Sequence, residues 1–228
     1  MLVFILVIAC VAGWWLSQQR IMSKPWLEQG AGVELEGSSL PTAKIGLGVF
    51  LAVVGALFAL FASAYFMRME YADWRTMPLP DLLLVNTIML VLSSAALQCA
   101  VIGARDDSMN AVRIGLVAGG VSAVAFLIGQ LLAWRELTAS GYFLTGNPAN
   151  SFFYLLTAMH GLHILGGLVA LSRTTAGAWG GAGPADLRLR VELCAMYWHF
   201  LLFVWIGLLV LFRGWAYQFI FICRQLLT

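Results

Sequence analysis

The stretch KIGLGVFLAVVGALFALFASAYFM at residues 44–67 gives the strongest structural signal in the sequence. Residues 45–67 carry no charged side chain. A helix rises 1.5 Å per residue, so about 20 such residues cross the roughly 30 Å hydrocarbon core of a bilayer. This stretch therefore predicts a membrane-spanning α-helix.

Other apolar stretches of similar character occupy most of the chain. They lie at roughly 1–17, 81–104, 112–134, 151–173 and 193–213. The first is short and resembles the apolar part of a signal peptide, but no basic residue precedes it and GWWL makes a poor cleavage site. We interpret it as a retained helix. The predicted fold is an all-α, polytopic transmembrane bundle of about six spans.

Composition supports a membrane protein and excludes several function classes. The chain is 61% hydrophobic and 11% charged, with a mean hydropathy of +0.89, whereas soluble domains are about 45–50% apolar and about 25% charged. A net charge of +2 with dispersed basic residues argues against nucleic-acid binding. The four cysteines lie in apolar stretches without a CxxC pair, which is typical of small membrane hydrophobes.

The distribution of lysine and arginine predicts the orientation. Eight of these residues fall on the side of the loops at 18–43, 105–110 and 174–192, and five fall on the other side. Because basic residues favour the cytoplasmic side, the first group is predicted to be cytoplasmic. Both termini would then be periplasmic in a bacterial inner membrane.

All three histidines lie in predicted helices. His160 and His163 are three residues apart and share a helix face, and His160 is about 13 Å from the start of its helix. A metal site needs three or four convergent ligands, and His199 is the one further histidine that could join them. We therefore predict no metal, cofactor or catalytic residue here, and expect each imidazole to have a hydrogen-bond partner, with packing, lipid or subunit contacts as its role.

Two amides also lie within apolar stretches. Gln130 is deep in 112–134, where an interhelical hydrogen bond is the favoured interpretation. Asn86 and its small polar neighbours in 81–104 favour close helix packing. The sequence contains no nucleotide-binding motif and no CxxCH haem-attachment motif.

The order of several motifs is more informative than any single one. KIGLGVFLA with FASAYF, PDLLLVNTIMLVLSS, FLIGQLLAW, FFYLLTAMHGLH and ELCAMYWHF follow one another between residues 44 and 213. The last two, at 152–163 and 192–200, are the most specific. In this order the chain resembles subunit III of the haem-copper oxidases, the cytochrome c oxidase family.

The resemblance implies a subunit without a redox centre. In the family, subunit I holds the haems and copper and reduces O2 to water with proton pumping, and subunit III packs on its flank, stabilises it and binds phospholipid. The implied partners are subunits I and II and membrane lipids, and membership of a larger respiratory supercomplex is left open. The candidate lipid-contact or subunit-contact residues are His160, His163, His199, Gln130, Asn86, Trp198 and Glu192.

Two positions depart from the family pattern. Val54 and Leu202 stand where the family often has carboxylates, which puts a proton-uptake role in doubt. The implied organisation is a helix at 1–17, a cytoplasmic loop at 18–43, the subunit III-like region at 44–213 and an apolar tail at 214–228.

Other functions remain open from the sequence. One alternative is subunit III of a quinol oxidase, and another is an accessory subunit of a nitric oxide reductase. An independent transporter is a further alternative, and it would predict broken helices or intramembrane charges, neither of which the sequence shows.

Overall fold

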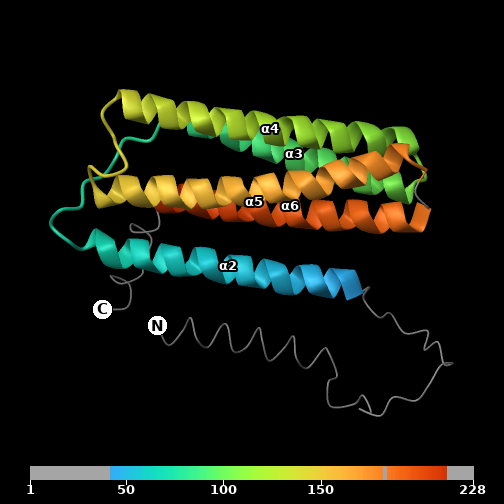
Figure 1. Cartoon of the computed structure of the whole chain (residues 1–228), viewed down its shortest axis with the longest axis horizontal. Coiled ribbons are helices and arrows are strands. Elements are labelled where there is room, and N and C mark those ends of the chain that lie inside the picture. Colours follow the sequence, from blue (N-terminus) through green and yellow to red (C-terminus); the bar gives the residue numbers. More distant parts are fainter. Residues whose placement is uncertain (1–41, 182–183, 215–228) are drawn as a thin grey trace, which may run out of the picture. The chain divides into compact units, whose positions relative to one another are not determined.

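The computed structural model describes residues 42–181 and 184–214, with the side chains of 184–186 excepted, and this part of the chain is a bundle of five long helices (Figure 1). Each is long and apolar enough to cross a membrane. The helices are α2 (Thr42–Met69), α3 (Leu82–Arg105), α4 (Met109–Ala139), α5 (Pro148–Trp179) and α6 (Pro184–Phe212). The five core spans predicted from the sequence are confirmed, whereas the predicted first span lies outside the described residues, as do nearly all of the 18–43 loop and the 214–228 tail.

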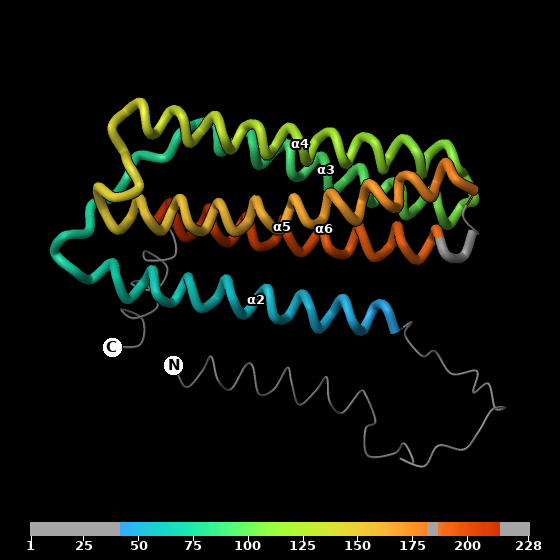
Figure 2. The backbone as a smooth tube through the Cα atoms, viewed as in Figure 1, coloured from blue at the N-terminus to red at the C-terminus, as the bar shows by residue number. Residues whose placement is uncertain are grey.

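The helices run up and down with short connections, as the backbone trace shows (Figure 2). Helices α2, α4 and α6 begin at the end of the bundle where α3 and α5 finish. We call this the Lys44 end, after a residue in the first turn of α2, and the opposite one the Arg68 end. The α3–α4 contact is the most extensive, α3 also packs on α6 and α4 on α5, and α2 lies against α5 and α6.

The helices extend further than the hydropathy pattern indicates. The predicted loop at 174–192 is mostly helical, because α5 continues to Trp179 and α6 begins at Pro184. A helix of 32 residues is about 48 Å long and so exceeds the hydrocarbon thickness, which means that its ends carry polar residues. Proline suits the start of α6 because the first helical position needs no N–H donor.

The connections on either side of α4 are also short. The 135–150 connector is reduced to residues 140–147, where the Asn147 side chain caps α5 by accepting a hydrogen bond from the N–H of Ala149. The 105–110 turn is confirmed and occupies 106–108, with Asp107 at a φ of 53°. These tight connections hold neighbouring helices antiparallel.

Small residues let α3 and α4 approach closely. A Cβ atom on Gly115 would lie 2.7 Å from the carbonyl oxygen of Ala96, so only glycine fits there without a shift. One turn further along, the hydroxyl of Ser93 donates to the carbonyl of Gly119 over 2.7 Å. Glycines four residues apart with an interhelical hydrogen bond are typical of tightly packed transmembrane helices.

Candidate functional site

Several of the polar side chains buried in the bundle join helices to one another. The amide of Asn86 on α3 donates to Oε1 of Gln130 on α4 over 3.4 Å, and both residues are buried. The interhelical amide hydrogen bond predicted for Gln130 is therefore confirmed. One turn of α3 is also tied to α6, because Trp205 Nε1 donates to Thr87 Oγ1 over 3.0 Å.

His160 is fully buried in an aromatic cage. Its ring stacks on Trp205 at a centroid distance of 5.2 Å, and Phe126 and Phe58 approach it edge-on at 5.8 and 6.3 Å. Within the described residues neither ring nitrogen has a hydrogen-bond partner, so the expectation of a partner for His160 is wrong. The physical reason is that its flanking rings offer no acceptor, and the indole N–H of Trp205 is already given to Thr87.

The other two histidines bond within their own helices rather than across the bundle. Nδ1 of His163 donates to the carbonyl of Met159 over 2.7 Å, and Nδ1 of His199 donates to that of Ala195 over 2.5 Å. The interhelical link near His163 uses its backbone, because the hydroxyl of Tyr197 donates to the His163 carbonyl over 2.8 Å. These imidazoles have partners, as expected, but the partners are not on neighbouring helices.

Trp198 is one of the largest fully buried side chains. Its ring packs against Gly167 of α5, where a Cβ atom would lie 2.8 Å from Trp198 Cζ3. This contact places α5 and α6 close together near the middle of the bundle. Trp198 thus acts in the core of this chain, and its indole N–H has no partner among the described residues.

Glu192 is the centre of an ion cluster at the Lys44 end. Its carboxylate is 2.7 Å from Lys44 Nζ on α2, 3.4 Å from Arg188 Nε on α6 and 3.8 Å from Arg105 Nη2 on α3. The Glu192 side chain is only 15% exposed, so these pairs are less screened by water than surface pairs. The cluster ties α2, α3 and α6 together at one end.

The sequence indicates Glu192 but not all of its partners. Arg188 could have been found, because a cation four residues before a carboxylate on a helix is a known pairing. Lys44 and Arg105 are far from Glu192 in sequence and give no such signal. Their pairing becomes visible only once the helices are placed.

The ligand-type side chains of the described residues are spread through the bundle. No group of three or more His, Cys, Asp or Glu residues in residues 42–181 and 184–214 could hold a metal ion. Asn86, Gln130 and Trp205 instead form hydrogen bonds between helices, and Glu192 pairs with basic residues at the Lys44 end. The geometry is that of a helix-joining network.

Comparison with known proteins identifies the family. Residues 42–217 match the model of the family described as cytochrome c oxidase subunit III. The chain belongs to this family. The match covers all five described helices, so the subunit III resemblance read from the motifs is confirmed, and the protein is a subunit III of a haem-copper oxidase.

Individual relatives agree with this assignment. The chain is 30% identical over 172 residues to the probable cytochrome c oxidase subunit 3 of Mycobacterium leprae, covering 72% of this chain and 83% of that one. It is 29% identical to the cytochrome c oxidase subunit 3 of Synechocystis over 73% of this chain and 72% of the relative. It is also 28% identical to the cytochrome bo(3) ubiquinol oxidase subunit 3 of Pseudomonas aeruginosa, over 54% of this chain and 59% of the relative.

Proposed function

We propose that this subunit III is the non-catalytic flank of a cytochrome c oxidase, where it stabilises the catalytic subunit I and contacts membrane lipid. The assembled complex would reduce O2 to water and pump protons, with haem and copper bound by its partner subunits. The observation that carries the proposal is the use of the buried polar side chains. Asn86, Gln130 and Trp205 are engaged in bonds between helices, as expected of a scaffold.

The cytochrome c type is supported by the relatives. Relatives named cytochrome c oxidase subunit 3 align over 54% to 73% of this chain at 29–32% identity, and the ubiquinol oxidase relative aligns over 54% at 28% identity. The P. aeruginosa relative makes quinol oxidation the second candidate, and both candidates assign this chain the same structural role.

Affinity purification of the tagged full chain from its native membrane tests this proposal. We expect subunits I and II to co-purify, a visible spectrum of haem in the complex, and O2 consumption with reduced cytochrome c as the donor. Consumption with quinol but not with cytochrome c would transfer the assignment to the second candidate. Isolation of the chain without any haem-containing partner would contradict both.

We also propose that the Lys44 end faces the cytoplasm. Among the described residues this end is the more basic one, and basic residues favour the cytoplasmic side. The basic residues at the Lys44 end are Lys44, Arg105, Arg113, Arg173, Arg188 and Arg190, and those at the Arg68 end are Arg68, Arg75, Arg135 and Arg213. A reporter that is active only in the cytoplasm, inserted in the 180–183 connector, should be active. Activity there of a reporter that works only in the periplasm would reverse the orientation.

A further inference from the structure

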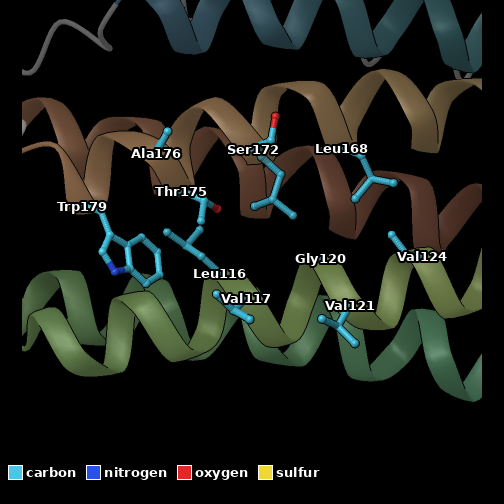
Figure 3. A pocket seen from close by; sticks show the side chains of 11 residues that line it. Leu116, Val117, Gly120, Val121, Val124, Leu168, Ser172, Thr175, Ala176 and Trp179 are labelled. Carbon is cyan, nitrogen blue, oxygen red and sulfur yellow. The ribbon is translucent and has the colours of Figure 1, made fainter.

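An apolar groove runs between α4 and α5 in the half of the bundle nearer the Lys44 end. It has a volume of about 640 Å³ and is lined by side chains of both helices (Figure 3). Leu116, Gly120 and Val124 line it on α4, and Leu168 and Trp179 line it on α5. Gly120 leaves room because it has no side chain, and a Cβ atom placed on it would be 3.5 Å from the nearest atom, an ordinary contact distance.

The groove has the depth of one bilayer leaflet. From Leu116 to Val124 the α4 backbone rises about 12 Å, and from Leu168 to Trp179 the α5 backbone rises about 16 Å. Half of the hydrocarbon core is about 15 Å. An acyl chain entering from the Lys44 end would therefore follow the groove to near the bilayer centre.

Arg113 stands at the mouth of this groove. It lies on the same face of α4 as Val117 and Gly120, and its guanidinium carbon is 5.3 Å from the ring centroid of Trp179. Its Nε and Nη2 both donate to the carbonyl of Ala178, at 3.2 and 3.1 Å, in the last turn of α5. These bonds hold the guanidinium in place and leave three of its five N–H groups for another acceptor.

The charge of Arg113 is not neutralised within the described part of the chain, where no carboxylate lies within ion-pair distance of it. The side chain is only partly exposed. A half-buried cation above an apolar groove, at the level of the headgroups, is complementary to a molecule with an anionic head and an apolar chain. Basic pockets between transmembrane helices bind anionic lipid headgroups in this way, and arginine matches phosphate geometry.

We propose that the α4–α5 groove binds one anionic phospholipid, with an acyl chain along Leu116, Gly120 and Val124 and its phosphate on Arg113. This inference rests on the lipid contact in the proposed function and specifies which lipid is bound and where. A transmembrane helix of a partner subunit is the competing occupant. Such a helix would not neutralise the Arg113 charge unless it placed a carboxylate at this depth.

The experiment uses the full chain alone, so that it does not depend on the oxidase partners. Chain reconstituted in vesicles of phosphatidylcholine with a minor fraction of phosphatidylglycerol is extracted gently, and its retained lipids are counted by native mass spectrometry. We expect one retained phosphatidylglycerol. Arg113→Gln should lower this retention roughly fivefold, because one basic residue at the surface contributes about 1 kcal/mol and 1.4 kcal/mol is tenfold.

Two matched controls separate the site from general effects. Arg173→Gln removes an exposed charge at the same end of α5 and should leave retention unchanged. Gly120→Leu should fill the groove and displace the lipid with Arg113 intact, whereas Gly46→Leu, at a position with nothing within 4 Å, should not. Circular dichroism of each variant verifies that the helices are formed.

The opposite results overturn the inference. Equal phosphatidylglycerol retention by wild type and Arg113→Gln would do so. Retention of phosphatidylcholine equal to that of phosphatidylglycerol would also do so, as would a Gly120→Leu variant that keeps its phosphatidylglycerol. Release of Gly120→Leu from the oxidase with unchanged lipid would assign the groove to a partner helix instead. If the chain co-purifies with subunits I and II but shows no selectivity for phosphatidylglycerol, the lipid inference fails and the proposed function stands. If the chain retains phosphatidylglycerol but does not co-purify with those subunits, only the proposed function fails.

Discussion

The replacement Gly115→Ala tests the closest contact of the bundle. The added Cβ would lie 2.7 Å from the Ala96 carbonyl oxygen and 2.9 Å from the backbone nitrogen of Ala100. Both are backbone atoms of α3, so no side-chain rotation relieves the clash and the two helices must separate by several tenths of an ångström. Overpacking of this kind costs about 1–3 kcal/mol.

Gly120→Ala is the matched control, since it makes the same exchange on the same helix. Its Cβ would meet only Leu171 Cδ2, at 3.5 Å. Alanine favours a helix over glycine by up to about 1 kcal/mol, and this gain is common to both variants. We therefore expect Gly115→Ala to be about 2 kcal/mol less stable than Gly120→Ala.

The assay is reversible unfolding of the full chain in mixed micelles, with SDS as denaturant and the helix signal in circular dichroism as the observable. The predicted result is a lower SDS midpoint for Gly115→Ala than for Gly120→Ala at an unchanged slope. Equal midpoints would contradict this prediction, because they would mean that α3 and α4 do not meet at Gly115 as closely as the structure places them.

Three further predictions follow from the described contacts. His160→Leu should keep the chain as stable as wild type, because the imidazole nitrogens have no hydrogen-bond partner to lose. His160→Ala should lower the free energy of unfolding by about 2–4 kcal/mol, because it leaves a cavity. Equal losses of stability for the two variants in thermal unfolding would mean that the ring has a partner. Glu192→Gln should weaken the α2–α6 contact by about 1–3 kcal/mol, measured as the coupling with Lys44→Met in a double-mutant cycle, and a coupling near zero would contradict the 2.7 Å pair. The hydrogen bond from Arg68 holds the pKa of Asp73 below its usual value. The contact between the two side chains should therefore be complete at pH values above the ordinary aspartate pKa and be lost as the pH falls through the lowered pKa of Asp73. An NMR titration of the Asp73 carboxyl that gives an ordinary pKa would oppose this.

Hydropathy alone predicts the existence of the five described helices but not their ends. The length of an apolar stretch indicates the part of a helix that lies inside the hydrocarbon. It gives no information on helical turns that continue into the headgroup region. That is why hydropathy predicts a loop at 174–192 although α5 and α6 occupy most of it. The close α3–α4 packing could have been read, since Gly115 and Gly119 are four residues apart in the sequence.

The candidate residues are predicted unevenly, and the differences have physical causes. The interhelical bond of Gln130 is predictable, because a lone amide in an apolar helix needs a partner. For His160 the same argument fails, since its neighbours are aromatic rings rather than acceptors. The partners of Glu192 on α2 and α3 could not be predicted, because they depend on how distant helices are placed.

The most direct test of the central claim is O2 reduction by the oxidase with and without this chain. Depletion of the chain from the purified complex, followed by measurement of initial turnover per haem, separates a structural role from a chemical one. We expect initial turnover near that of the intact complex, followed by a faster decline as the unprotected catalytic subunit is damaged. Immediate and complete loss of turnover, with the partner subunits assembled and the haem spectrum unchanged, would contradict it and assign this chain a direct part in the chemistry.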